Sequence, residues 1–209
     1  MEDVLDVYEM PYDPAYPVVC MDESSKQLIG EVAAPIPAAP GRPERIDHEY
    51  VRNGVASIFL EVEPLAGRRH VQVTERRTAV DWAWYVRDLL EVRYPDATKV
   101  RLVMDNLNTH STASFYQAFD PATARRLAER LEIHHTPKHG SWLNIAENEL
   151  SSLTRQCVSG RRFESIGKLQ SEIRHWSDHS NKRQRGVDWQ FKVKDARKKL
   201  KSLYPKIKT

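Results

Sequence analysis

Two aspartates stand at the ends of two short apolar runs that lie far apart in the chain. Asp22 ends the run YPVVCMDE (16–23), and Asp105 ends the run KVRLVMDN (99–106). An ionised carboxylate beside apolar side chains is costly unless it is paired, hydrogen-bonded or bound to a metal ion. The two residues are therefore a candidate pair for chemistry. The alternative is that each only caps its strand or starts a turn, as Asp commonly does.

A third acid would complete a metal-binding cluster. Glu147 and Glu149 lie in a segment whose helical spacing turns Leu143, Ala146 and Leu150 inward. Glu147 flanks this apolar stripe, whereas Glu149 points farther away. Two Asp and one Glu supply hard oxygen ligands, which suit Mg²⁺ or Mn²⁺ and not zinc. Such a cluster can hold two ions roughly 3.5–4 Å apart, an arrangement suited to in-line attack on a phosphodiester.

Hydrophobic periodicity predicts the elements that position these acids. Strands are expected over 16–23, 55–63, 70–75, 99–106 and 132–137. Helices are expected over 78–95, 111–131 (split at Pro121), 142–158, 167–176 and 194–204. Thr78 with Asp81 three residues on predicts the start of the first of these helices. The proline-rich stretch 34–44 is expected to be a loop. Three strands followed by alternating helices and strands predict an α/β fold, a mixed sheet covered by helices.

Composition narrows the function classes. The chain has 209 residues, of which two are cysteines, so a disulfide scaffold is excluded. No stretch approaches the roughly 18 apolar residues of a membrane span. The N-terminus has no apolar stretch typical of a signal peptide, so a cytoplasmic location is expected. The formal charge is −8 over residues 1–50, zero over 51–150 and +11 over 151–209. Such a basic C-terminal segment favours a polyanionic partner, nucleic acid first, over a merely solvated surface.

Three segments carry a resemblance to a known family. YPVVCMDE, VMDNLNTH and HGSWLNIAENEL, in this order, resemble the three acidic motifs of DDE transposases of the mariner superfamily, in its bacterial insertion-sequence branch. The connecting sequences PLAGRRHVQVTERRTAVDW and RRLAERLEIHHTPKHGSWLN are also similar to this branch. The resemblance covers residues 16–160 and continues more weakly to the end of the chain.

The resemblance implies a fold and a site. The fold would be RNase H-like, an α/β fold with a mixed five-stranded sheet and helices on both faces. Asp22, Asp105 and Glu147 would be the catalytic, metal-binding triad and would hold two Mg²⁺ or Mn²⁺ ions. The sequence departs from the family at Ile145 and Ala146, where Pro and Ile are common, so Glu149 stays a rival to Glu147.

The implied activity is metal-dependent cleavage and strand transfer of DNA. Water would cut the transposon end, and the freed 3′-hydroxyl would then attack target DNA. The implied partners are transposon terminal repeats, target DNA, and a homodimer mate or a partner that carries a helix-turn-helix region. The setting would be the bacterial cytosol, at the nucleoid.

The domain division and the chain start leave alternatives open. Residues 1–160 are expected to form the catalytic domain and residues 161–209 a basic helical extension. Only 21 residues precede Asp22, too few for the usual N-terminal DNA-binding region. The chain would then be the product of a second reading frame or a truncated, defective copy. The alternative functions are a non-cleaving remnant that binds DNA or a partner, and a host RNase H-like nuclease.

Weaker signals surround the acidic motifs. Asn106 and His110 could orient a ligand or contact phosphate, or could only bond within their loop. Lys138 and His139 could contact the DNA backbone. Trp142 could stack on a base or belong to the core. The pair His175 and His179, at i and i+4 in a predicted helix, is read as a surface pair rather than a zinc site.

Overall fold

The computed structural model of the chain describes residues 1–107 and 110–204. Its strands form one five-stranded sheet in the order β3-β2-β1-β4-β5. The strands are β1 (Val18–Glu31), β2 (Tyr50–Glu63), β3 (Arg68–Thr74), β4 (Val100–Met104) and β5 (Leu131–His135). Strand β1 is antiparallel to β2 and parallel to β4, β3 is antiparallel to β2, and β5 is parallel to β4. The expected mixed five-stranded sheet is confirmed.

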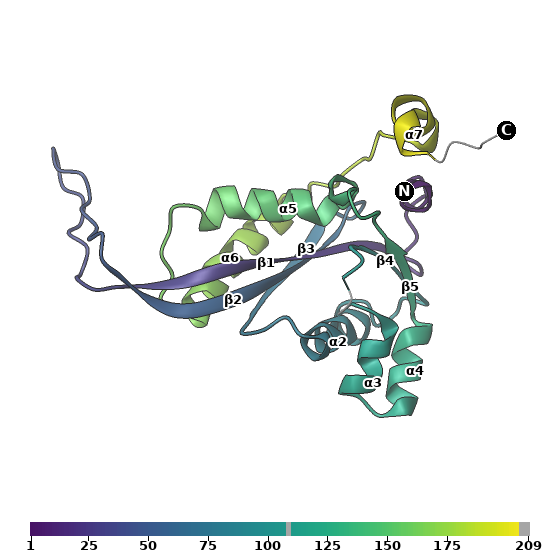
Figure 1. The fold of residues 1–209 in the computed structure, drawn as a ribbon, viewed down its shortest axis with the longest axis horizontal. Helices are drawn as coiled ribbons and strands as arrows, with labels where there is room; N and C mark the ends of the chain where they lie inside the picture. Colours follow the sequence, from purple (N-terminus) through teal and green to yellow (C-terminus); the bar gives the residue numbers. More distant parts are fainter. Residues whose placement is uncertain (108–109, 205–209) are drawn as a thin grey trace.

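Helices cover both faces of this sheet (Figure 1). The α-helices are α1 (Glu2–Tyr8), α2 (Ala79–Asp88), α3 (Phe115–Ala118), α4 (Pro121–Glu129), α5 (Ile145–Leu153), α6 (Ile166–Lys182) and α7 (Val193–Lys199). A π-helical turn extends α2 over Leu89–Arg93 and another extends α5 over Thr154–Val158, and 3₁₀ turns lie at Thr112–Ser114, Ser141–Leu143 and Lys201–Leu203. Helices α5 and α6 lie on one side of the sheet, and α2, α3 and α4 on the other. In the described part of the chain, no helix is long and apolar enough to cross a membrane.

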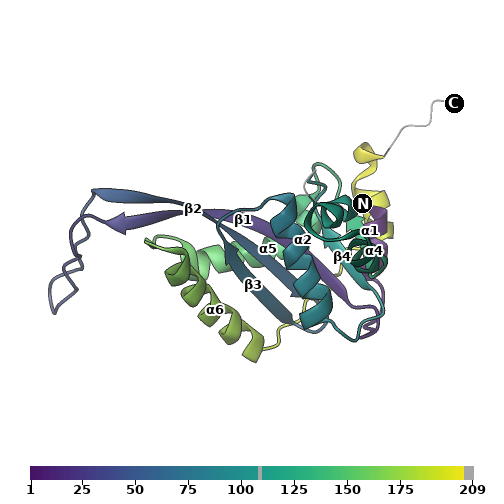
Figure 2. The ribbon, with the colours of Figure 1, turned by 90° about the horizontal axis from the view of Figure 1, so that it is seen from below.

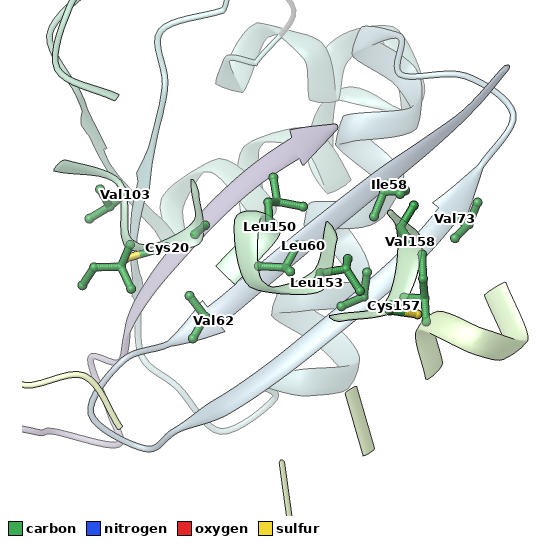
Figure 3. Packing of buried hydrophobic residues seen from close by; sticks show 14 of the residues in the cluster. Cys20, Ile58, Leu60, Val62, Val73, Val103, Leu150, Leu153, Cys157 and Val158 are labelled. Carbon is green, nitrogen blue, oxygen red and sulfur yellow. The ribbon is translucent and has the colours of Figure 1, made fainter. Parts of the chain in front are cut away.

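The alternation of strand side chains produces two buried clusters, one on each face. On β2, Leu60 belongs to the cluster that packs under α5, where it joins Leu150 and Leu153 (Figure 3). Phe59, the preceding residue, belongs to the other cluster and packs with Trp82 of α2. The central strands are thus apolar on both faces, and a polar residue at their ends stands out.

Two strands are longer than the periodicity predicts. Beyond the sheet, β1 and β2 continue as a two-stranded ribbon that projects from the body (Figure 2). On the β2 side of the ribbon, residues 50–55 are all exposed, so this part of β2 has no buried face to produce a hydrophobic alternation. The proline-rich residues 34–44 lie at its far end as the expected loop, held by isolated bridges such as Ile36 with Arg45.

Local signals for helix ends are confirmed. The hydroxyl of Thr78 accepts a hydrogen bond from the Asp81 amide, and the Asp81 carboxylate accepts one from the Thr78 amide, which together form the expected capping box. The helical region around Pro121 is split: α3 ends at Ala118, and α4 begins with Pro121 after the N-cap Asp120. Helix α1 is an element that the periodicity analysis did not anticipate.

The boundary at residue 160 stays a prediction. Helix α6 packs against β3, and α7 lies beside α1 at the opposite end of the chain. Residues 205–209 of the expected extension lie outside the described residues.

Candidate functional site

The parallel pairing of β1 with β4 brings Asp22 and Asp105 to one region. Cys20 on β1 is in register with Val103 on β4. Two residues later come Asp22, still within β1, and Asp105, directly after the end of β4. Cys20 and Val103 belong to the same buried cluster. Because side chains alternate with a period of two, the acids continue on the face of that cluster.

Glu147 reaches the same face from the first turn of α5. Asn144 fixes the start of this helix: its side-chain oxygen accepts a hydrogen bond from the Ala146 amide at 3.1 Å, and its Nδ2 donates to the Met21 carbonyl at 2.9 Å. Asn144 is fully buried, so β1 and α5 are tied together one residue from Asp22. The Oε2 atom of Glu147 is buried and has no hydrogen-bond partner in the described structure.

Asp22 and Glu147 line one cleft of about 480 Å³. Its other lining residues are Glu23, Ser24, Leu150, Ser151, Thr154 and Arg155. Burial raises the pKa of Asp22 to about 6, against a 2.8 Å hydrogen bond from the Glu23 amide, and the charges of Asp105 and Glu147 raise it further. The charges of Asp105 and Glu147 therefore both act on Asp22.

Asp105 does not line this cleft. Its Oδ1 atom lies 3.6 Å from Nδ1 of His110. Among residues 1–107 and 110–204, no three His, Cys, Asp or Glu side chains are arranged closely enough to hold a metal ion. The donor set still suits a hard divalent cation, because it consists of carboxylates only and includes the unpartnered oxygen of Glu147.

Glu23, the residue after Asp22, belongs to an ionic network with the buried His110 and the half-exposed Arg77. The His110 Nε2 atom lies 3.0 Å from Glu23 Oε2, and Arg77 Nη1 lies 3.2 Å from Glu23 Oε1. The His110 ring stacks on Trp82 at a centroid distance of 5.6 Å. Burial opposes protonation of His110, but the neighbouring carboxylates of Asp105 and Glu23 outweigh it and raise its pKa to about 9. A cationic His110 thus connects Asp105 to Glu23.

Glu149 is engaged elsewhere. Its Oε2 accepts a hydrogen bond from Arg69 Nε at 2.5 Å, and its Oε1 accepts one from Arg69 Nη2 at 2.8 Å. This bidentate ion pair is largely buried, because both side chains have little exposed surface. The two rival glutamates therefore differ in surroundings: Glu147 faces the cleft, and Glu149 neutralises an arginine from β3.

The weaker candidates from the sequence are mostly on the surface. Trp142 is 42% exposed and does not belong to the core. Exposed positions are also occupied by Asn106, Lys138, His139, His175 and His179. Two residues of the second motif, Asn108 and Thr109, lie outside the described part of the chain.

Sequence reasoning missed Glu23, Arg77 and Asn144. Nothing in the local pattern marks Glu23 as buried, since it follows Asp22 at the end of an apolar run. Its partners are 54 and 87 residues away. Asn144 could have been found as an N-cap, because it directly precedes a helical apolar stripe.

Solved structures of Mos1 transposase have a similar fold. The Mos1 strand transfer complex matches with a TM-score of 0.54 and 13% identity over 78% of this chain and 48% of that chain. The Mos1 mariner paired end complex with Mn matches with a TM-score of 0.54 and 16% identity, over 86% of this chain and 54% of that chain. The Mos1 transposase catalytic domain with raltegravir and Mg matches with a TM-score of 0.52 and 13% identity, over 87% of this chain and 84% of that chain. The RNase H-like fold implied by the motifs is thereby confirmed.

Three further findings concern sequence and length. No curated protein is similar enough in sequence to give a match. The chain spans about half the length of the Mos1 chains in the two DNA-end complexes. A family model, described as the DDE superfamily endonuclease, matches residues 17–170 and so includes Asp22, Asp105 and Glu147. Because this match covers most of the sequence, the chain belongs to the DDE superfamily of endonucleases.

Proposed function

We propose that this chain is the catalytic part of a mariner-like DNA transposase, with Asp22, Asp105 and Glu147 as its metal-binding acids. One observation carries the proposal: Asp22 and Glu147, 125 positions apart in sequence, line one cleft of about 480 Å³. The charges of Asp105 and Glu147 both raise the pKa of Asp22, which supports Asp105 as the third acid of the site. Membership of an endonuclease superfamily supplies the reaction class.

The acids would hold Mg²⁺ or Mn²⁺, as the donor chemistry favours. Divalent cations bound there would activate the attacking oxygen and stabilise the leaving oxygen in phosphodiester cleavage. The chain itself supplies the positions: β1 and β4 carry the aspartates, and Asn144 fixes the first turn of α5 that carries Glu147. Asp105 must leave its contact with His110, or share it, to join the other two.

DNA is the proposed substrate and partner. Solved Mos1 structures include a paired end complex and a strand transfer complex, and the basic C-terminal segment of this chain fits a polyanion such as DNA. Because the chain spans about half of those Mos1 chains, we infer that recognition of terminal repeats needs a further DNA-binding region, on a partner or beyond this sequence. Assembly as a homodimer is part of the proposal, and the site of action would be bacterial chromosomal DNA in the cytosol.

Plasmid cleavage tests the proposal. The plasmid carries the terminal repeats that flank the gene, and cleavage is measured with Mg²⁺ or Mn²⁺ and with chelator. We expect metal-dependent nicks at the repeat ends, with losses of at least 100-fold in Asp22→Asn, Asp105→Asn and Glu147→Gln, since each removes a charge from the cation site. Glu129→Gln, an exposed acid on α4, is the matched control and should retain activity.

Two outcomes would overturn the assignment. Full activity in Asp105→Asn would remove Asp105 from the site. A loss of cleavage in Glu149→Gln but not in Glu147→Gln, with both proteins folded, would show that Glu149 and not Glu147 is the third acid. Cleavage that ignores the terminal repeats would instead favour a host nuclease.

A second candidate function is a non-cleaving DNA-binding or partner-binding protein. The observation that favours it is the described arrangement of the acids, in which no three side chains converge on one ion. This alternative predicts DNA binding with a steep salt dependence and no nicking at any Mg²⁺ or Mn²⁺ concentration.

A further inference from the structure

Aromatic rings gather on the surface beside the N-terminal end of α5. Trp142 lies nearly parallel to Trp189, with ring centroids 6.5 Å apart and planes at 20°. It meets Phe191 nearly edge-on, at 5.6 Å and 72°. Trp142 is 42% exposed, and the other two rings are partly buried. We call Trp142, Trp189 and Phe191 the aromatic shelf.

Segments from three parts of the chain hold the shelf in place. Tyr8 of α1 donates a hydrogen bond to the Leu143 carbonyl at 2.7 Å, and its ring lies 5.1 Å from that of Trp189. The Trp189 indole donates to the Phe191 carbonyl at 2.8 Å. In Figure 1 the segment between α6 and α7 runs past the start of α5. The rings are therefore ordered before any ligand arrives, which lowers the entropy cost of binding.

The charge around the shelf selects the class of ligand. The Lys199 ammonium lies 5.7 Å from the Phe191 ring centroid, and Lys138 and Lys194 are exposed nearby in sequence to the shelf residues. An exposed face of indole binds flat rings, and the Lys199 ammonium beside Phe191 favours an anion. A nucleic acid strand combines both features, whereas an acidic peptide lacks the flat rings.

The shelf is connected to the proposed site through Asn144. Trp142 precedes Asn144 by two residues, and the Asn144 side chain bonds to the Met21 carbonyl next to Asp22. A base on Trp142 would thus belong to a strand that leads into the cleft. We propose that the aromatic shelf binds an unpaired base of a DNA strand whose backbone enters the cleft, an inference that rests on the proposed function.

Binding of two DNA probes without metal tests the inference. The probes are a 12-nucleotide oligothymidine and a fully paired hairpin with the same number of phosphates, both in chelator and followed by fluorescence anisotropy. We expect Trp142→Ala to weaken binding of the single strand by roughly tenfold or more and binding of the hairpin less than twofold, because only unpaired bases can stack. Trp142→Phe should retain most of the preference for the single strand.

Trp84→Ala is the matched control. Trp84 is another exposed tryptophan, 46% exposed, but it lies on α2 across the sheet. Its removal should leave both affinities unchanged. The wild-type protein should also show quenching of tryptophan fluorescence by the oligothymidine, and Trp142→Phe should lose most of it.

Three results would overturn the inference. They are unchanged single-strand affinity in Trp142→Ala, an equal loss for both probes in a folded Trp142→Ala protein, and a change in self-association on sedimentation without a change in DNA affinity. The last would indicate that a second copy of the chain covers the shelf. Because no metal or cleavage is involved, a failure of the plasmid assay does not decide this test.

Discussion

At the scale of single residues, Asn144 links two elements of the candidate site through the hydrogen bonds of its side chain. Its one side chain caps α5 and bonds to β1, so it sets the distance between the element that carries Glu147 and the one that carries Asp22. Both bonds are shielded from water, since the residue is 1% exposed. A change at this position therefore affects stability and the proposed chemistry together.

Replacing Asn144 tests this linkage. Asn144→Ala removes the cap and leaves the Met21 carbonyl unpaired, for which we expect a loss of about 1–3 kcal/mol in the free energy of unfolding by urea. Asn144→Asp keeps the cap acceptor but not the donor, so it should recover only part of that loss. DNA cleavage should fall more than DNA binding in both variants. An Asn144→Ala protein with unchanged stability would contradict this role.

His70 on β3 gives a prediction about pH. It pairs in register with Glu61, and its ring lies 6.1 Å from that of Tyr85. Burial, and then the charge of Arg93, lower the pKa of His70 to about 4. The pKa of a histidine in the unfolded chain is about 6.5. Between this pH and about 4, His70 is protonated in the unfolded chain but neutral in the folded protein. The contribution of His70 to stability is therefore lost as pH falls from about 7 towards 4.

The measurement must separate His70 from its neighbour Glu61. Burial raises the pKa of Glu61, so that group contributes with the opposite sign as pH falls. Comparison with His70→Gln isolates the histidine: the wild type should lose free energy of unfolding relative to the variant between pH 7 and pH 4. Parallel curves for the two proteins would show that His70 does not have the lowered pKa.

Residue patterns predicted part of the candidate site. The ends of apolar strands pointed to Asp22 and Asp105, because an acid beside buried side chains is visible in sequence. Helical spacing favoured Glu147 over Glu149, but the ion pair that engages Glu149 was not visible, because its partner Arg69 is 80 positions away. The network of Glu23 with His110 depends on a stack against Trp82, which no local pattern encodes.

At the scale of elements, β3 is the edge strand at one side of the sheet, and α6 covers its open edge. The Asn181 side chain accepts a hydrogen bond from the Arg69 amide at 2.8 Å and donates one to the Arg69 carbonyl at 2.8 Å. Gln170, three turns earlier on the helix, accepts from the Val73 amide at 2.6 Å. Amide side chains thus take the place of a neighbouring strand, which prevents the edge from pairing with another chain.

Removal of one such amide should open the edge. Asn181→Ala leaves the amide of Arg69 unpaired, while the Arg69 carbonyl keeps the hydrogen bond from the Ser177 hydroxyl at 3.4 Å. We therefore expect a loss of about 1–3 kcal/mol in stability and faster hydrogen exchange of that amide. Lys182→Ala, at the exposed next position, is the control and should change stability by less than about 0.5 kcal/mol. Equal exchange in both variants would mean that the Arg69 amide is protected by other contacts.

The elements were predictable where one face is buried. The core parts of β1, β2 and β4 show clear alternation or apolar runs, and the split at Pro121 follows from its missing amide. Helix α1 was not anticipated because seven residues are too few to be stable alone. It is held by distant partners: Asp3 bonds to His134 and Glu2 to Arg197.

At the scale of the whole molecule, the body and the ribbon contribute unequally to stability. The buried clusters include Leu28 and Ala56 but no residue from 29 to 55. The base of the ribbon contacts the body through Ile29, whose amide bonds to the Phe163 carbonyl, and through Asn53, which bonds to the Glu164 carbonyl. The far end, seen in Figures 1 and 2, extends away from the body.

Shortening the ribbon tests this division. Replacing residues 34–44 by Asn-Gly should change the free energy of unfolding by less than about 1 kcal/mol, since no buried area is lost and loop closure depends only weakly on length. The matched variant Asn53→Ala breaks the contact at the base of the ribbon. It should lower the free energy of unfolding by at least as much as removal of the eleven residues. Urea unfolding of both proteins decides the matter. A loss of several kcal/mol on shortening would mean that the far end of the ribbon stabilises the body after all.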